Sequence, residues 1–253
     1  MCAWLLSVLL TLISCSAAAA EAVRLTNGEW PPYLGEQLPY KGVASRIVSE
    51  AFALQGIDVA WDFYPWARSL QMAERGKRIG SAIWLRSKER ERKFFISDAV
   101  VESSYYLFYR KGYNFNWKQI DDLQSARIVG TRGYNYGEAF QQAEASGKLR
   151  VNRVTSDETA FRQLLAGRVD LFPVDKVVGF DILHKNFSPA ERSQLSFHSK
   201  PLRTDSLHLL LSRKVPGNAE LMVRFNRGLQ ELRESGKITQ YLLEIQQPLS
   251  HTP

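Results

Sequence analysis

The sequence predicts an α/β protein that folds as two lobes joined by two crossing strands. Apolar, strand-like runs alternate with amphipathic helical patterns along the chain, which is typical of α/β architecture. Residues 161–172 repeat the helix–Gly–basic–strand order of residues 70–84, as two similar lobes would. Residues 105–111 and 207–214 are apolar strands that each end in Arg-Lys, so we expect them to connect the lobes.

The elements of the first lobe follow in order. A strand at 23–26 precedes a loop rich in Pro and Gly, and a helix then carries Val43, Ile47, Ala51 and Leu54 on one face and ends at Gly56. After it we expect a strand at 59–63, a helix from Pro65 to Gly76 and a strand at 80–84.

The remaining elements complete the two lobes. Gly133 to Gly137 precede an amphipathic helix, and residues 169–174 form a strand. Pro216 opens a helix with Leu221, Phe225, Leu229 and Leu232 on one face, and Gly236 separates it from a closing helix at 238–245. We therefore expect lobe 1 to comprise residues 21–110 plus 205–253, and lobe 2 residues 111–204.

The N-terminus indicates export. Residues 4–13 form an apolar run too short to span a bilayer, and alanines 17–20 offer a cleavage site before Glu21, so residues 1–20 read as a signal peptide. A buried core helix is the alternative, and no Lys or Arg precedes the run. Residues 12–15, Leu-Ile-Ser-Cys, resemble a lipobox. We expect a periplasmic protein, either soluble after cleavage or lipid-anchored through Cys15.

Composition excludes several classes of function. Only Cys2 and Cys15 are present, so the domain after cleavage has no disulfide, cysteine nucleophile or thiolate metal site. The net charge of +7 comes from basic residues scattered along the chain, which argues against nucleic acid and for a mild preference for anionic ligands. No histidine pair has the spacing of a helical metal site, and no Gly-x-Ser-x-Gly occurs. We expect no metal and no cofactor.

The most informative segment runs from Ile83 to Asp98. Ser87 can cap a short helical turn, which brings Arg90 close to the exposed backbone of the preceding strand. A guanidinium and backbone amides can then converge on one small anion. This favours capture of a small carboxylate-bearing molecule.

The chain resembles the polar amino-acid class of periplasmic solute-binding proteins, the receptors of ABC importers (bacterial extracellular solute-binding protein family 3). The resemblance covers essentially the whole chain after residue 20. It is carried by five motifs in order: Trp30-Pro31-Pro32-Tyr33, Gly76-Lys77, Ser87-x-x-Arg90 with Phe95-x-Ser97-Asp98, Gly130-x-x-Gly133, and Gly167-Arg168-Val169-Asp170 followed by Asp175. It implies the type II periplasmic-binding-protein fold, a monomer, and an ABC permease as partner.

The resemblance also implies roles for single residues. Arg90 matches the arginine that grips the ligand's α-carboxylate, and Asp175 the acceptor for its α-ammonium, with a helix N-cap as the alternative role for Asp175. Trp30 and Tyr33 are the expected aromatic contacts. Further candidates for the pocket are Trp84, Tyr64, Tyr134, Asn135 and Trp66, of which Trp66 suits core packing better.

Two departures from the family bear on the ligand. Leu85 stands where many relatives have a hydroxyl residue, and Ile79 where they often have Asp. Leu85 removes one polar contact at the site. A standard amino acid is therefore only one option, beside a keto acid, a dipeptide fragment or an aromatic carboxylate.

Two other functions fit the same scaffold. Some relatives dehydrate cyclohexadienyl carboxylates such as arogenate; candidate bases here are Glu29, Asp175 and histidines 184, 198, 208 and 251. We expect no catalytic residue, because lone histidines usually serve the surface or a cap. A receptor for a membrane signalling protein would have the same pocket, so the sequence does not separate it from transport.

Overall fold

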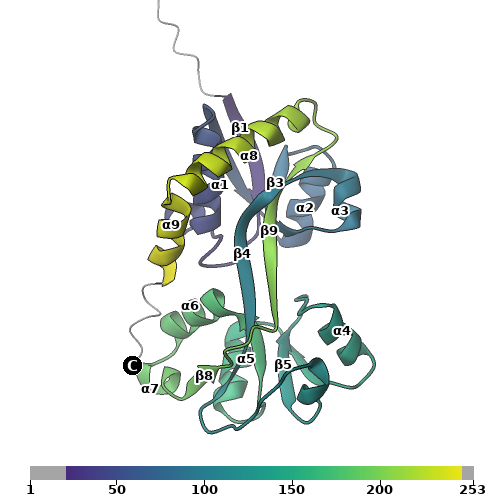
Figure 1. Ribbon diagram of the computed structural model, residues 1–253, viewed down its shortest axis with the longest axis vertical. Coiled ribbons are helices and arrows are strands. Elements are labelled where there is room, and N and C mark those ends of the chain that lie inside the picture. Colours follow the sequence, from purple (N-terminus) through teal and green to yellow (C-terminus); the bar gives the residue numbers. More distant parts are fainter. Residues whose placement is uncertain (1–20, 247–253) are drawn as a thin grey trace, which may run out of the picture.

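The computed structural model describes residues 21–246 (Figure 1). The expected signal peptide and Cys15 lie outside these residues. The strands are β1 (Glu21–Asn27), β2 (Ile57–Phe63), β3 (Gly80–Leu85), β4 (Phe94–Arg110), β5 (Arg127–Thr131), β6 (Arg150–Val154), β7 (Phe172–Asp175), β8 (Leu195–Phe197) and β9 (Arg203–Ser212). The α-helices are α1 (Val43–Ala53), α2 (Trp66–Glu74), α3 (Lys88–Lys93), α4 (Glu138–Ala145), α5 (Asp157–Leu165), α6 (Lys176–Asn186), α7 (Pro189–Arg192), α8 (Asn218–Glu234) and α9 (Lys237–Gln246). Short 3₁₀ turns occupy η1 (Pro39–Lys41) and η2 (Ile120–Leu123).

Two groups of elements are joined by β4 and β9 (Figure 1). We call the group with β1 to β3, α1 to α3, α8 and α9 lobe 1, and the group with β5 to β8 and α4 to α7 lobe 2. The larger sheet runs β2-β1-β3-β9-β4-β7, with β8 also on β4, while β5 and β6 form a separate parallel pair. The predicted α/β fold with two crossing strands is confirmed.

The crossing strands are longer than the sequence indicated. β4 has 17 residues and pairs antiparallel with β9 from Phe94↔Ser212 to Tyr105↔Arg203. Its first part thus belongs to the sheet of lobe 1, and its last part pairs with β7 and β8 in lobe 2. One β4–β9 ladder, with register shifts between Ile96 and Val101, therefore links the two lobes.

The core of lobe 1 lies between the sheet and helices α1 and α8. Val43, Ile47 and Ala51 of α1 are buried as predicted, but Leu54, the C-cap residue of the helix, is 48% exposed. Phe52 packs on Phe225 of α8, with ring centroids 4.8 Å apart. Gly228 lets the helices approach closely, since a Cβ there would lie 2.0 Å from the Ala51 carbonyl oxygen.

The core of lobe 2 is built around aromatic side chains. Phe161 of α5 makes edge contacts with Phe108 and Phe172, with ring centroids 5.4 and 5.0 Å apart. A second buried cluster contains Tyr136 and Phe140 and supports the loop that leads into α4. That loop carries several residues of the site described below.

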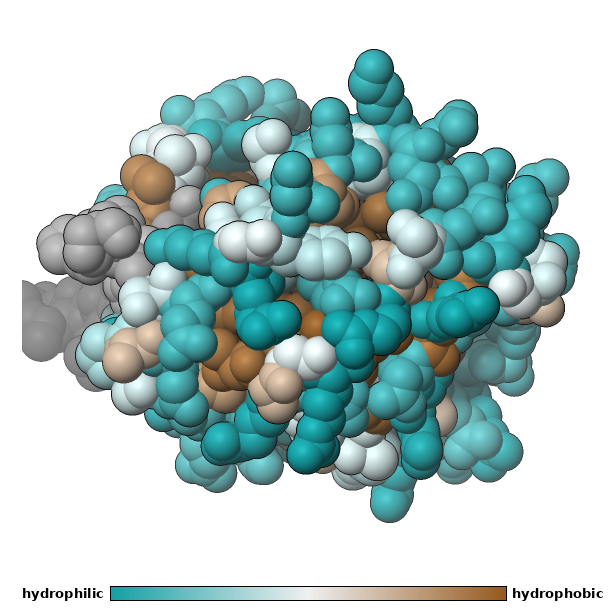
Figure 2. All heavy atoms as spheres, turned by 90° about the horizontal axis from the view of Figure 1, so that it is seen from below, coloured by the Kyte–Doolittle hydropathy of each residue, from teal (hydrophilic) through white to brown (hydrophobic). Residues whose placement is uncertain are grey.

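The face at the lobe 2 end is largely hydrophilic. Seen from this end, hydrophilic residues dominate, and hydrophobic residues show mainly in recesses between them (Figure 2). Among residues 21–246 no helix combines the length and apolar character needed to cross a bilayer.

Candidate ligand-binding site

A cavity of about 460 Å³ lies beside the crossing strands and is lined from both lobes. Lobe 1 contributes Trp30, Trp66, Ile83, Trp84, Leu85 and Arg90. The crossing strands contribute Ser103, Tyr105, Arg203, Asp205 and Leu207, and the loop before α4 contributes Arg132, Gly133, Tyr134 and Asn135. We call this cavity the cleft.

Arg90 is positioned by the local structure that the sequence predicts. Ser87 caps α3, and its Oγ accepts a 3.2 Å hydrogen bond from the Arg90 amide. The guanidinium donates through Nη1 to the Leu85 carbonyl oxygen at 2.5 Å and lies 4.9 Å from the Trp84 ring centroid. Arg90 forms no ion pair among residues 21–246, and burial lowers its pKa. A half-buried cation that forms no ion pair in the described chain, and that only the nearby charge of Glu89 opposes, thus lines the cleft.

A bulge in β3 shapes the wall beside Arg90. Between Ser81 and Trp84 the register against β9 shifts, and Ile83 within the bulge has φ of 66°, a left-handed conformation that β-branched residues rarely adopt. The indole Nε1 of Trp84 donates to Ser81 Oγ at 2.8 Å. The bulge turns the end of β3, and with it Trp84 and Leu85, toward the cleft.

Three tryptophans give lobe 1 an apolar, aromatic wall. Trp66 packs edge-on against Trp84, with centroids 5.1 Å apart, and Trp30 stacks on Tyr33 at 4.6 Å. The expectation that Trp66 serves mainly the core is therefore incomplete, since its ring also lines the cleft. Such rings suit a planar or apolar ligand body.

Lobe 2 presents one arginine and one amide to the cleft. Arg132 is exposed, and within residues 21–246 its side chain donates one hydrogen bond, from Nε to the Arg153 carbonyl oxygen at 3.3 Å. Asn135 Oδ1 accepts from the Gly137 amide at 2.8 Å and from Arg203 Nη1 at 3.1 Å. The loop before α4 is thus held by its own turn and by β9.

Arg203 and Asp205 neutralise each other at the cleft wall. Arg203 Nε forms an ion pair with Asp205 Oδ2, and Nη1 also donates to the Asn135 carbonyl oxygen at 2.8 Å. Both side chains are less than a quarter exposed. The charges of Arg203 and Asp205 are therefore paired with each other within the protein.

Asp175 lies behind the wall of the cleft. It is 1% exposed and caps α6, with Oδ1 accepting from the Val177 and Val178 amides at 2.9 and 3.1 Å. Its Oδ2 accepts from Ser103 Oγ at 2.7 Å. Burial raises its pKa, and these hydrogen bonds oppose the rise. The helix N-cap, the alternative role predicted for Asp175, is thus present in the structure.

Tyr33 and Tyr64 also lie outside the lining of the cleft. Tyr33 is 2% exposed, and burial together with the neighbouring Asp175 carboxylate raises its pKa. Tyr64 lies near Arg68, whose Cζ is 4.9 Å from its ring centroid. Neither residue lines the cleft, and the direct ligand contact that the sequence predicts for them stays a prediction.

The structure brings together seven residues that the sequence singles out. These are Arg90, Trp30, Trp66, Trp84, Leu85, Tyr134 and Asn135. Sequence reasoning missed Arg132, Arg203, Asp205, Ser103 and Tyr105, which also line the cleft. Arg132 lies inside the Gly130-x-x-Gly133 motif, and this position is the feature of the sequence that could have indicated its place in the cleft.

The acid–base candidates stand apart from the cleft. Glu29 accepts from the Glu36 amide at 3.0 Å, and His208 Nδ1 is 2.8 Å from the Ser97 carbonyl oxygen. His184 and His198 contact Arg192 and Lys200 on the surface. His251 lies outside the described residues, and within residues 21–246 no cluster of His, Cys, Asp and Glu could hold a metal ion.

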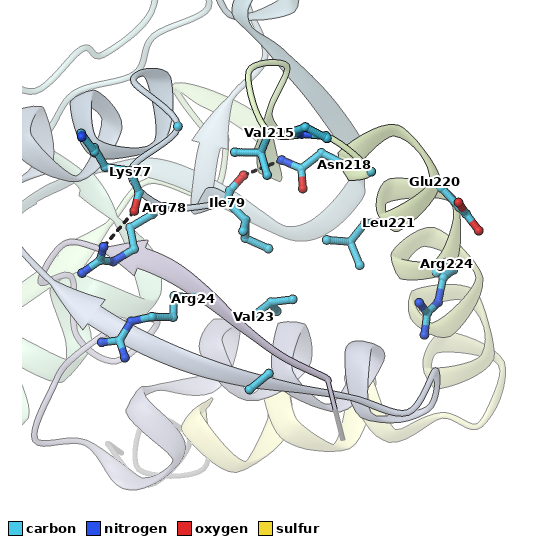
Figure 3. Close-up of a pocket in the computed structure, with 14 residues that line it drawn as sticks. Val23, Arg24, Lys77, Arg78, Ile79, Val215, Asn218, Glu220, Leu221 and Arg224 are labelled. Carbon is cyan, nitrogen blue, oxygen red and sulfur yellow. Dashed lines mark hydrogen bonds between the residues drawn. The ribbon is translucent and has the colours of Figure 1, made fainter. Parts of the chain in front are cut away.

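A second cavity, of about 530 Å³, lies within lobe 1 between the start of β1, the turn before β3 and α8 (Figure 3). Its Arg24 and Arg78 both pair with Asp62. Asn218 donates to the Ile79 carbonyl oxygen at 2.9 Å, drawn as a dashed line in Figure 3. These polar groups hold lobe 1 together, so the cleft is the better candidate for a ligand.

Comparisons with known proteins agree with the fold. No family model matches the chain. It is 24% identical over 216 residues to the L-cystine-binding protein TcyJ of Escherichia coli (strain K12), covering 84% of this chain and 77% of the relative. A histidine kinase sensor domain with similarity to periplasmic binding proteins matches with a TM-score of 0.70, 19% identity and coverage of 89% and 96%. An ancestral arginine-binding protein bound to arginine matches with a TM-score of 0.68, 19% identity and coverage of 88% and 97%. The fold is that of the two-lobed binding proteins.

Proposed function

We propose, on the premise that this chain is a solute-binding protein of the polar amino-acid class, that it captures a small carboxylate-bearing molecule between its lobes and delivers it to an ABC importer. The observation that carries this is Arg90, a half-buried guanidinium that faces the cleft without an acidic partner in the described chain. A planar fork of N–H donors matches the two oxygens of a carboxylate. The relative that binds L-cystine supports a small organic solute.

Binding would proceed by closure of the lobes. The solute first contacts Arg90 and the tryptophan wall of lobe 1, and the loop with Tyr134 and Asn135 then closes over it. Closure excludes water and so strengthens the charged contacts. We propose that the division is 21–110 plus 205–253 for lobe 1 and 111–204 for lobe 2, and that a permease recognises the closed form.

We propose binding without chemistry. The relatives found are binding proteins, and none of the acid–base candidates within the described chain lines the cleft. A signalling role on the same fold has one supporting observation, the match to a histidine kinase sensor domain. Transport and signalling would use the same cleft and would differ only in the partner protein that recognises the closed form. We place the protein in the periplasm.

A ligand screen tests the proposed function. The purified chain without residues 1–20 is heated with amino acids, L-cystine, keto acids and dicarboxylates, and a ligand raises the melting temperature by mass action. We expect a carboxylate to raise it for the parent protein and not for Arg90→Ala. A compound that stabilises both proteins equally would contradict the proposed role of Arg90.

A further inference from the structure

The charges that line the cleft do not balance. Its lining contains three arginines, Arg90, Arg132 and Arg203, against the single carboxylate of Asp205. Because Arg203 and Asp205 pair with each other, Arg90 and Arg132 are left without an acidic partner among residues 21–246. Arg90 belongs to lobe 1 and Arg132 to lobe 2. The cleft thus presents, from each lobe, one arginine that forms no ion pair in the described chain.

An ammonium group would find no unpaired carboxylate among the residues that line the cleft, because Asp205 already forms an ion pair with Arg203. Asp175 is buried, and its oxygens already accept from Ser103, Val177 and Val178. Asp157, the acid behind the loop with Tyr134, is 7% exposed, and Oδ1 accepts from Thr131 Oγ1. A cation buried without a partner is strongly disfavoured. The cleft therefore selects against the zwitterionic head of an α-amino acid.

The apolar part of the cleft indicates the body of the ligand. Trp30, Trp66 and Trp84 line it from lobe 1, and Tyr105 and Tyr134 line it from β4 and lobe 2. Aromatic rings on both sides favour an aromatic, and therefore flat, ligand body, against which they can stack or pack edge-on. A volume of about 460 Å³ is adequate for a single ring with two substituents.

We propose that the ligand is a flat organic dianion without an ammonium group, held by one acidic end on Arg90 and by the other on Arg132. This rests on the proposed function and names its class of solute. Each acidic end neutralises the cation of one lobe, so the ligand removes the repulsion between Arg90 and Arg132 as the lobes close. A singly charged acid satisfies Arg90 and leaves Arg132 unpaired.

Three matched compounds test the proposal by calorimetry. 4-Carboxyphenylacetate is a flat dianion, 4-carbamoylphenylacetate replaces one acid by a neutral amide, and 4-carboxyphenylglycine adds an α-ammonium to the dianion. We expect 4-carboxyphenylacetate to bind, and each of the other two to bind at least about tenfold more weakly, since each loses an ionic contact or buries an unpaired cation.

Variants locate the second acid. Arg132→Gln should weaken 4-carboxyphenylacetate at least about tenfold and change 4-carbamoylphenylacetate less than about twofold. Arg150→Gln, an exposed arginine of lobe 2 outside the cleft, carries the same change of charge and should alter neither affinity. An equal loss in both arginine variants would mean that Arg132 acts only through net charge, and the proposal would fall.

Different results would overturn the dianion ligand and the capture of a solute through Arg90. If 4-carboxyphenylglycine or L-cystine binds in an Arg90-dependent manner and more tightly than 4-carboxyphenylacetate, the dianion proposal is overturned and solute capture stands. Failure of 4-carboxyphenylacetate, terephthalate and isophthalate to bind at millimolar concentration also overturns the dianion proposal. If Arg90→Ala does not weaken the binding of any compound that binds the parent protein, both the dianion proposal and the proposed capture through Arg90 are overturned.

Discussion

Ser103 Oγ donates a 2.7 Å hydrogen bond to Oδ2 of Asp175, and Ser103, not Asp175, lines the cleft. Two backbone amides of α6 occupy the other carboxylate oxygen. Tyr105, whose backbone pairs with Asp175 across β4 and β7, also lines the cleft. The carboxylate is thus enclosed by donors of the protein and serves the packing of lobe 2.

Replacing Asp175 tests this assignment. Asp175→Ala removes the N-cap of α6 and leaves buried donors unpaired, so we expect a loss of about 2 to 4 kcal/mol in the free energy of unfolding. Asp175→Asn keeps a capping oxygen and should lose less. Urea denaturation measures both. If the variants keep the parent's stability but lose affinity for the best compound of the screen, Asp175 contacts the ligand after all.

Asp157 should give the stability of the protein an unusual dependence on pH. Burial raises its pKa above the ordinary value of 3.8, and hydrogen bonds from Thr131 and Tyr134 only partly oppose the rise. The folded protein then binds this proton more tightly than the unfolded chain does. Its contribution to stability is complete below the ordinary pKa and is lost as pH rises through the raised one.

The comparison of Asp157→Asn with the parent isolates this contribution. The free energy of unfolding, measured by urea at intervals from about pH 4 to pH 7, should fall more with rising pH for the parent than for the variant. Carboxyls with a lowered pKa, such as Asp170 beside Arg127, give the opposite slope in both proteins and cancel in the difference. Parallel curves for the two proteins would show that Asp157 is not perturbed.

The parts of the site that depend on nearby residues could be predicted from the sequence. Ser87 and Arg90 are three residues apart, so the cap that orients Arg90 is visible in the chain. The alternation of strands and helices likewise predicts the α/β fold, and two strands that end in Arg-Lys indicate the connections between lobes. Each of these signals lies within a short window of residues.

The parts that depend on distant residues could not be predicted. Arg203 begins β9, and only the pairing of β9 with β4 brings it to the cleft beside Arg90. The sequence did not decide between two roles for Asp175, because an aspartate at the start of a helix suits both a helix N-cap and a ligand contact. Ile83 adopts a left-handed backbone conformation that β-branched residues disfavour, so no local sequence pattern indicates the bulge.

Arg90→Ala should weaken binding of the best carboxylate from the screen by about 2 to 5 kcal/mol, since it leaves a buried anion without its partner. The affinity of Arg90→Lys should lie between those of the parent and Arg90→Ala, because an ammonium keeps the charge but cannot present a planar fork of donors. Calorimetry measures both. Arg86→Ala, in the same segment but exposed and paired with Glu91, is the matched control and should bind normally. An effect of similar size in the control would indicate a disturbed turn and not a lost contact.

Trp30 should distinguish flat ligands from flexible ones. Its ring lines the cleft and stacks on the buried Tyr33, so Trp30→Ala removes a rigid surface without removing a charge. We expect 4-carboxyphenylacetate to lose about 1 to 2 kcal/mol of binding free energy, from lost ring contact and apolar burial. Glutarate, which carries two acids on a flexible chain, should lose distinctly less. Calorimetry with both compounds gives the comparison, and equal losses would show that Trp30 shapes lobe 1 and does not contact the body of the ligand.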